Sequence, residues 1–373
     1  MPSHLHLLGC DRSELSTLIE QEGEPPFRAQ QLLEAIYQQR VDALEKISTL
    51  PQSLRSTLAA KNISIGLPNV KQRFTSQDGT VRYLFSFDDG QSVEAVWMPE
   101  GDGGETGDGS EAGDPATGTR RWDRATICVS SQVGCAVDCH FCLTALLGVK
   151  RNLTAGEIVG QVLAILNDQK VSPPQDRINL VFMGMGEPFL NYDNFMKAVR
   201  LLVGEAGIAE SRMTVSTAGI VPRIQDFGDE PIRPKLAISL NASNDELRTR
   251  LMPLNRKWNI EKLIAAARSF PLRNRERITF EYVLLNGVND SVQNAQEVVE
   301  LLRGMRTKVN LIALNPGPGI EFSTPAEERV SGFQQVLLRA GIPAFVRRPR
   351  GRDIYAACGQ LKQTVELATT PVV

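Results

Sequence analysis

Apolar and polar positions follow three different patterns along the 373-residue chain. Near the N-terminus apolar residues recur at helical spacing in FRAQQLLEAIYQQR (27–40) and LPQSLRSTLAAK (50–61), which predicts helices. Residues 70–99 instead alternate β-prone runs with two Asp-Gly turn signals, which predicts three antiparallel strands. We therefore expect a small N-terminal helical domain over residues 1–65, followed by a short antiparallel β extension over residues 66–99.

From about residue 124 onward, short apolar runs alternate with amphipathic helices. The predicted strands begin near residues 125, 178, 212, 235, 277 and 309, and the helices between them include 154–169 and 291–305. Six strand–helix units indicate an α/β fold with a parallel sheet, and closure as a partial (βα)6 TIM-like barrel over residues 121–373. In such folds the chemistry lies at the C-terminal ends of the strands.

Residues 100–119, EGDGGETGDGSEAGDPATGT, hold six acidic and no basic residues. This segment has too few large apolar side chains to order itself, so residues 100–120 are predicted to be a mobile loop. The whole chain has a formal charge of -2, but without this segment 41 basic residues face 37 acidic ones, a net charge of +4. The remainder is mildly basic, and the run RRPRGR (347–352) either meets nucleic-acid phosphates or is a solvated basic face.

The sequence shows no targeting or membrane segment. Its N-terminus, MPSHLHLLGCDRSE, lacks a basic stretch followed by an apolar one, and no window approaches the ~18 apolar residues of a membrane span. We therefore expect a cytoplasmic protein without membrane contact. Cytoplasmic thiols stay reduced, so clustered cysteines there indicate metal or redox chemistry.

Four of the six cysteines lie in CVSSQVGCAVDCHFC (128–142). Cys135, Cys139 and Cys142 form a C-x3-C-x2-C run after the first predicted strand of the barrel. Three thiolates on a short loop can hold a [4Fe-4S] cluster and leave one iron without a protein ligand. The alternative is a four-cysteine zinc site completed by Cys128 or Cys358. Structural zinc sites usually pair C-x2-C units, so the spacing favours the cluster.

Several longer motifs accompany the cysteine run: CVSSQVGC, RNLTAGEIVGQV, VFMGMGEPFLNYDN and RGRDIYAACGQL. With the cysteine loop and the six βα units, they resemble the radical S-adenosylmethionine (SAM) enzymes. More narrowly, they are similar to the RNA adenosine C2-methyltransferases, which modify 23S ribosomal RNA in the peptidyl transferase centre and certain tRNAs at the adenosine 3' of the anticodon. The resemblance covers most of the chain, including the FRAQQL helix and the VEAVWMP strand.

The resemblance implies the ligands of two cofactors. Cys135, Cys139 and Cys142 would hold the [4Fe-4S] cluster, whose open iron chelates SAM. The implied SAM site consists of residues that follow the predicted strands, namely Gly186, Glu187, Ser216, Ser239, Leu240, Asn241 and Asn315. The family usually has histidine where this chain has Asn241, so an imidazole contact is missing, although an amide also donates and accepts hydrogen bonds.

The resemblance also implies a role for the two outlying cysteines. C2 of adenine is electron-poor and cannot attack the SAM methyl group as a nucleophile, so a radical route is needed. Cys358 would accept a methyl group from one SAM, and a second SAM, cleaved at the cluster, would activate that methyl for addition to C2. Cys128 would then release the product by forming a disulfide with Cys358, and Glu94 would be the proton acceptor. An isolated glutamate in a strand is otherwise expected to be a surface carboxylate.

The expected partners are 23S rRNA and tRNA, together with an electron donor such as flavodoxin or ferredoxin, and we expect a monomer. One alternative is an enzyme of the same superfamily that methylates C8 of adenosine. A more distant one is a zinc-dependent RNA-binding protein without catalysis, which would leave MGMGEP and the Cys358 motif unexplained.

Overall fold

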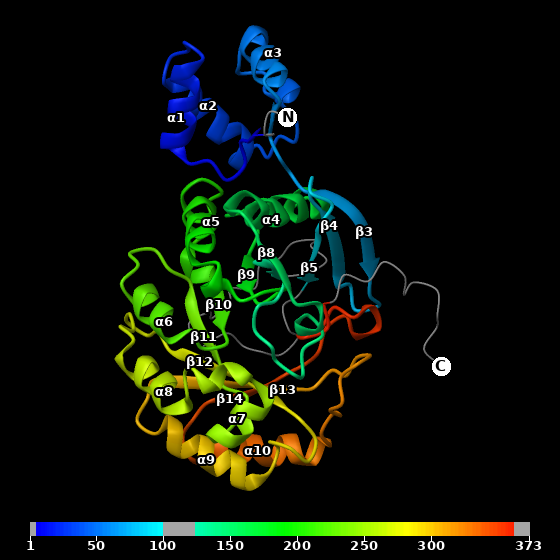
Figure 1. Cartoon of the computed structure of the whole chain (residues 1–373), viewed down its shortest axis with the longest axis vertical. Coiled ribbons are helices and arrows are strands. Elements are labelled where there is room, and N and C mark those ends of the chain that lie inside the picture. The colour runs from blue at the N-terminus through cyan, green and yellow to red at the C-terminus, as the bar shows by residue number, and fades with distance from the viewer. Residues whose placement is uncertain (1–4, 100–123, 362–373) are drawn as a thin grey trace.

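The computed structural model describes residues 5–99 and 124–361, so the acidic segment 100–119, predicted to be mobile, lies outside the described residues. A ten-stranded mixed sheet forms the body, and its strands lie side by side in sequence order (Figure 1). In that order they are β3 (Asn69–Thr75), β4 (Val81–Ser86), β5 (Ser92–Pro99), β6 (Ala125–Cys128), β9 (Ile178–Phe182), β10 (Met213–Thr217), β11 (Lys235–Ser239), β12 (Ile278–Leu284), β13 (Thr307–Ala313) and β14 (Ala344–Arg347).

Strands β3 to β6 pair antiparallel, and β6 to β14 pair parallel. The predicted α/β class and open parallel barrel are confirmed, with one addition, because β14 makes a seventh parallel strand. The sheet does not close on itself, since β3 and β14 are its two edges. The chain after β14 returns to β3 and β4, as the red and cyan segments of Figure 1 show.

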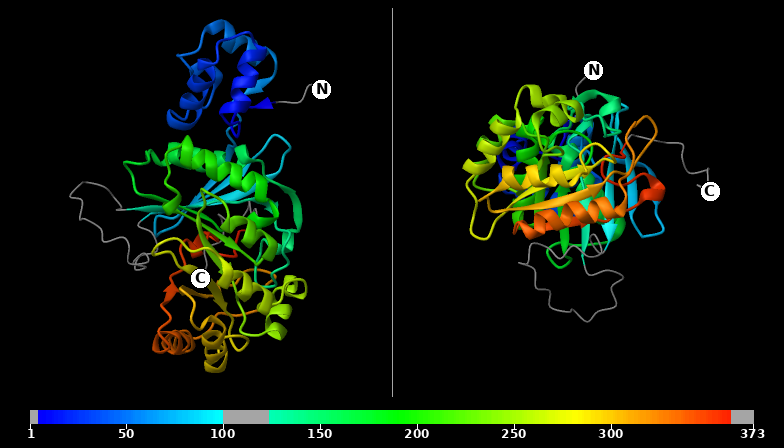
Figure 2. Two further views of the ribbon diagram at one scale, coloured as in Figure 1. Left: turned by 90° about the vertical axis from the view of Figure 1, so that its left-hand side faces the viewer. Right: turned by 90° about the horizontal axis from the view of Figure 1, so that it is seen from below.

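Helices cover the outer face of the parallel strands and bury their apolar sides against it. They are α4 (Ala155–Gln169), α5 (Tyr192–Gly204), α6 (Val221–Gly228), α7 (Asp245–Leu251), α8 (Ile260–Ser269), α9 (Val292–Leu302) and α10 (Glu327–Arg339). Helices α9 and α10 pack side by side at one end of the molecule (Figure 2, right). Within the described part of the chain, no helix is long and apolar enough to cross a membrane.

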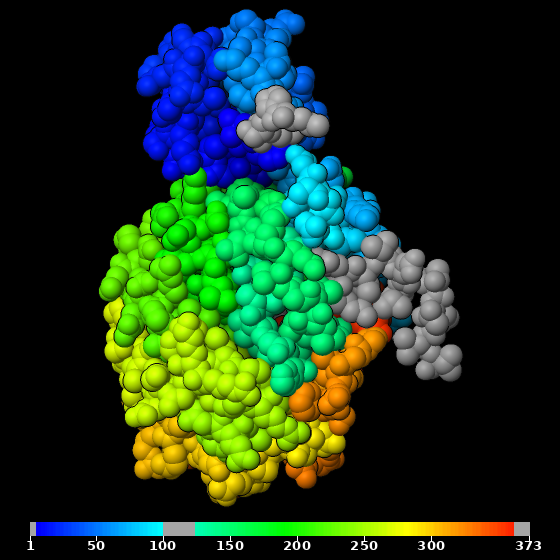
Figure 3. Space-filling view, in the orientation of Figure 1, coloured from blue at the N-terminus to red at the C-terminus, as the bar shows by residue number. Residues whose placement is uncertain are grey.

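The N-terminal residues form a lobe that projects from the body (Figure 3). It contains β1 (Leu5–His6), α1 (Arg12–Gln21), α2 (Phe27–Leu33), α3 (Gln52–Ala60) and β2 (Ile63–Ser64), with a π-helical turn after α2. The lobe packs closely against α4 at Gly9. A Cβ on this glycine would come within 2.5 Å of the backbone nitrogen of Gly156. An ion pair of 2.6 Å between Glu14 and Lys197 adds a second link to the body.

Candidate active site

A cavity of about 280 Å³ opens on the inner face of the sheet. Strand register brings its lining together, because Cys128 lies opposite Val181 and Ser239 lies opposite Glu281 on neighbouring strands. All the predicted site residues except Glu94 and Leu240 line it: Cys128, Cys135, Cys139, Cys142, Gly186, Glu187, Ser216, Ser239, Asn241, Asn315 and Cys358. The structure therefore brings residues from most of the chain's length into one site.

The three clustered cysteines lie on a loop closed by a small hairpin of β7 (Gln132–Gly134) and β8 (Val149–Asn152). The N–H of Cys135 donates to the carbonyl of Gly148 (3.2 Å) at the base of this loop. Gly134 has a φ of +77°, and a Cβ there would lie 1.8 Å from that same carbonyl oxygen. Only glycine fits this position, and the close approach fixes both ends of the cysteine loop.

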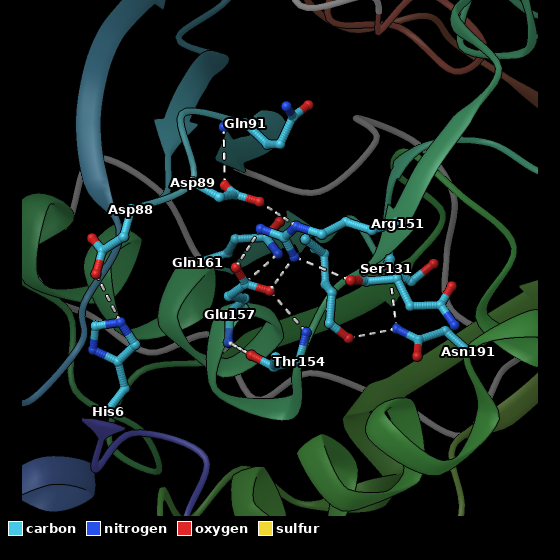
Figure 4. Close-up of polar contacts among 12 residues, drawn as sticks. His6, Asp88, Asp89, Gln91, Ser131, Arg151, Thr154, Glu157, Gln161 and Asn191 are labelled. Carbon is cyan, nitrogen blue, oxygen red and sulfur yellow. Dashed lines mark hydrogen bonds and ion pairs between the residues drawn. The ribbon is translucent and has the colours of Figure 1, made fainter. Parts of the chain in front are cut away.

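Polar and charged side chains bind the hairpin to neighbouring elements (Figure 4). Arg151 on β8 donates to Asp89 (2.6 Å) and makes two bonds of 2.7 Å to Glu157 at the start of α4. Glu157 also forms a capping box with Thr154. The amide of Asn191 donates to the carbonyl of Ser131 (2.8 Å) on the other side. The cysteine loop is therefore attached to the β4–β5 turn, to α4 and to the start of α5.

The thiols of Cys135, Cys139 and Cys142 are desolvated in the cavity, and burial raises the pKa of each. Both of its neighbours raise the pKa of Cys139 further, so three thiols crowd one region. Among residues 5–99 and 124–361, no three His, Cys, Asp or Glu side chains converge closely enough to hold one metal ion. A cubane cluster binds each thiolate through a different iron, so its ligands need not meet at one point. This donor set fits a cluster held by three thiolates.

Glu187 follows β9, lies beside the cysteine loop and is buried, with 4% of the residue exposed. Burial raises its pKa to about 7, although the N–H groups of Ala218 (2.6 Å) and Phe189 (3.0 Å) donate to it and oppose that rise. Gly186, with a φ of +99°, lets the chain pass Gln132, since a Cβ would come within 2.6 Å of that side chain. A buried carboxylate that lines a cavity is suited to bind an ammonium group.

The residues predicted to bind SAM at the ends of β10 and β11 have two kinds of contact: the serine hydroxyls lie in the cavity, and the other two residues bond to the backbone of β12. The hydroxyls of Ser216 and Ser239 lie 3.3 Å apart in the cavity. Asn241 adopts a φ of +58°, which asparagine tolerates, and its Oδ1 accepts from the N–H of Val283 (2.8 Å). Leu240 is fully buried, and its N–H donates to the carbonyl of Glu281 (3.0 Å). Asn241 and Leu240 thus fix the ends of β11 and β12 relative to each other.

A buried arginine that the sequence did not reveal holds the same strand ends. The Arg248 guanidinium donates to the carbonyls of Ala218 (2.7 Å), Ser239 (3.1 Å) and Leu240 (3.1 Å). Burial lowers the pKa of Arg248 to about 10, so it stays a cation at neutral pH. Arg248 therefore joins the chain after β10 to the chain after β11 and places a positive charge near Cys139.

Cys128 and Cys358 reach the cavity from opposite ends of the body's sequence. Cys128 on β6 is 8% exposed, and Cys358, which follows β14, is exposed. Burial raises the pKa of Cys128, and the nearby Cys358 raises it further. Cys128 is thus held as a thiol within electrostatic reach of Cys358.

Glu94 is not the surface carboxylate that an isolated glutamate in a strand would be. It is completely buried on β5 and forms an ion pair with the buried Arg82 on β4. Val96, two residues further along, lies opposite Cys128, so Glu94 and Cys128 share the inner face of the sheet. The antiparallel extension therefore contributes to the site, although Glu94 does not line the cavity itself.

Sequence reasoning also missed polar residues of the cavity wall. Glu281 on β12 is 6% exposed and accepts from the amide of Asn310 (2.8 Å), and burial raises its pKa. The sequence signal that could have identified Glu281 is a single acidic residue inside the apolar run ITFEYVL. Buried charged residues are rare unless they are paired or functional. The basic run RRPRGR, which the sequence had already singled out, also reaches the cavity, since Arg347, Arg348 and Arg350 line it.

Comparison with known proteins agrees with this geometry. The model of the radical SAM superfamily matches residues 129–302, and that of the ribosomal RNA large subunit methyltransferase N-terminal domain matches residues 5–63. A crystal structure of a radical SAM methyltransferase from Sphaerobacter thermophilus has 42% sequence identity and a TM-score of 0.85, covering 96% of this chain and 100% of that one. The fold and site thus define a radical SAM methyltransferase.

Sequence relatives narrow the assignment. The probable dual-specificity RNA methyltransferase RlmN of Koribacter versatilis is 66% identical over 94% of this chain and 99% of its own length. The dual-specificity RNA methyltransferase RlmN of Anaeromyxobacter sp. is 45% identical over 96% of this chain and 90% of its own length. The chain belongs to the RlmN family of dual-specificity RNA methyltransferases.

Proposed function

We propose that this protein methylates C2 of adenosine in 23S rRNA and in tRNA, with Cys358 as the methyl carrier. One observation carries the proposal, namely that Cys358 and Cys128 share a single cavity with the three cysteines of the C-x3-C-x2-C loop. The names of the relatives specify RNA methylation with dual specificity. The atom C2 and the two RNA classes follow from the motif resemblance.

Cys135, Cys139 and Cys142 would hold a [4Fe-4S] cluster, and Glu187 would accept the amino group of SAM beside it. The cluster and SAM supply, when bound, the one-electron chemistry that adenine C2 requires. The hydroxyls of Ser216 and Ser239 offer hydrogen bonds deeper in the cavity. An electron donor such as flavodoxin or ferredoxin would reduce the enzyme, which we infer acts as a monomer.

Cys358 is suited to receive and carry a methyl group because it is exposed at the cavity. Its thiolate sulfur would attack the methyl carbon of SAM, forming an S–C bond with release of S-adenosylhomocysteine. After the carbon has been joined to adenine C2, RNA and enzyme are covalently linked through Cys358. Glu94, which is held in its ion pair with Arg82, would then receive the C2 proton.

Cys128 would complete the cycle. Its sulfur attacks the sulfur of Cys358, an S–S bond forms, and the electron pair of the broken S–C bond stays with the carbon, which takes up a proton to become a methyl group. Two electrons from the donor reduce the disulfide. Because Cys128 is held as a thiol, it must lose its proton at this step, and burial keeps it from reacting earlier.

The target adenosine would enter the cavity splayed out of its RNA stack. Arg347, Arg348 and Arg350 lie where phosphates next to that nucleotide would pass. The N-terminal lobe would extend the RNA contact, in line with the ribosomal methyltransferase domain that its sequence matches.

Peptide mass spectrometry on Cys358 tests the proposal, after anaerobic reconstitution and incubation with SAM. We expect a methyl group on Cys358 only when cluster and SAM are both present. An unmodified Cys358 beside an enzyme that cleaves SAM would contradict the carrier role. Nucleoside chromatography of the treated RNA should give 2-methyladenosine, whereas 8-methyladenosine would indicate the C8 reaction instead.

A further inference from the structure

The segment that carries Cys358 is attached to the body on both sides of the cysteine. On the N-terminal side, the N–H of Gly351 donates to Asp78 (3.0 Å) and the hydroxyl of Ser76 donates to Asp353 (2.5 Å). The acceptor Asp78 and the donor Ser76 both belong to the turn between β3 and β4. This attachment holds the start of the segment to the antiparallel extension.

On the C-terminal side, the segment is attached to the cluster loop. The N–H of Leu143 donates to the carbonyl of Gly359 (2.8 Å), and the Oγ1 of Thr144 donates to the carbonyl of Leu361 (2.6 Å). The two donors directly follow Cys142 in the sequence. The loop that supplies a cluster ligand thus also holds the backbone next to Cys358.

The bond from Thr144 is shielded from water, since Thr144 is 3% exposed and Leu361 is 4% exposed. Cys358 itself is exposed, and Gly359 beside it has a φ of +78°, so the cysteine lies at a turn. A side chain at an exposed turn is placed mainly by the backbone on either side of it. The shielded bond at Leu361 is therefore well situated to set the position of the sulfur.

We propose that Thr144 is a positioning residue that fixes Cys358 relative to the cluster loop. The inference rests on the proposed role of Cys358 as methyl carrier, and it adds that the loop binding the cluster also positions the carrier sulfur. Disorder of the cluster loop would at the same time remove the two hydrogen bonds that Leu143 and Thr144 donate to the carrier segment. The enzyme would thus present Cys358 for methylation only when the loop next to Cys142 is in place.

The test compares Thr144→Val, which keeps the shape but removes the donor, with Thr144→Ser, which keeps the hydroxyl. Thr307→Val is the matched control, because Thr307 is equally buried and donates to the carbonyl of Ile278 (2.8 Å) far from the cavity. Hydrogen exchange of residues 356–361 is measured on cluster-free and reconstituted protein. The rate of Cys358 methylation and the affinity for SAM are measured on the reconstituted protein.

For Thr144→Val we expect exchange at residues 359–361 to rise about tenfold and Cys358 methylation to slow about tenfold, as expected when one buried hydrogen bond is lost. SAM affinity should stay within about twofold, and Thr144→Ser should restore both rates. If hydrogen exchange at residues 359–361 were the same in cluster-free Thr144→Val as in the cluster-free wild type, the inference would be overturned, even if the variant bound iron poorly. If the wild-type enzyme never methylated Cys358, the proposed function would fail, while the exchange comparison would still decide the role of Thr144.

Discussion

Glu94 and Arg82 form a buried ion pair on the inner face of the sheet, one strand away from Cys128. Burying two charges is costly, and removing only one of them leaves the other buried without this ion pair. Arg82 is also the ion-pair partner of the carboxylate that is the proposed proton acceptor, so stability and the proposed proton transfer involve the same cation.

We therefore expect Arg82→Leu to lower the free energy of unfolding by about 3–5 kcal/mol. The double variant Arg82→Leu/Glu94→Leu should recover much of that loss, because neither charge is then buried alone. Arg73→Ala is the control, since its ion pair with Asp168 is partly exposed and should contribute less than about 1 kcal/mol. Urea unfolding of the cluster-free proteins measures all three. Equal losses in Arg82→Leu and Arg73→Ala would contradict this account.

A second residue-scale prediction concerns the carboxyl of Glu187, whose pKa is raised to about 7 by burial. A carboxyl with a raised pKa stabilises the fold in its neutral form, so its contribution is full below about pH 4.5 and is lost as the pH rises through 7. Relative to Glu187→Gln, the wild type should lose about 2–3 kcal/mol of stability between these pH values. The free energy of unfolding of both proteins is measured against pH without SAM. A difference between the two proteins that does not change with pH would refute the expectation.

At the scale of elements, the β7–β8 hairpin determines whether the cysteine loop can form. A Cβ at position 134 would collide with the carbonyl of Gly148, and the backbone there has a positive φ. We expect Gly134→Ala to lower iron incorporation at least about tenfold, while the circular dichroism of the barrel is retained. Gly204→Ala, at a helix end with open space around it, should incorporate iron normally. Normal iron content in Gly134→Ala would show that the hairpin can adapt.

The sequence predicted those elements whose apolar pattern is long and regular. The six predicted strands are mostly buried, and they consist largely of apolar and β-branched residues. Strand β14, AFVR, is short and partly exposed, and β7 and β8 are too short to show a period, so they were not predicted. The motifs identified the cavity's cysteines and Glu187. The pairing of Glu94 with Arg82 depends on strand register, and the contacts of Arg248 on tertiary packing, which a linear pattern does not contain.

At the scale of the whole molecule, charge is distributed to favour an anionic partner at the cavity. Arg348 is exposed and Arg350 is half-buried, and both line the opening. We expect Arg348→Ala/Arg350→Ala to weaken RNA binding and to reduce the slope of log affinity against log salt by about two. Arg339→Ala, exposed at the end of α10, should leave the slope unchanged. An unchanged slope in the double variant would exclude a phosphate contact there.

The sheet is assembled in sequence order from β3 to β14, and the last described segment then spans its two edges. During synthesis the ribosome therefore delivers every strand of this sheet and the three clustered cysteines before it delivers Cys358. A chain that ended before residue 358 would contain all ten strands and would lack the sulfur of the proposed methyl carrier. The order of the chain would then act as a safeguard, because the group proposed to link covalently to RNA is added last.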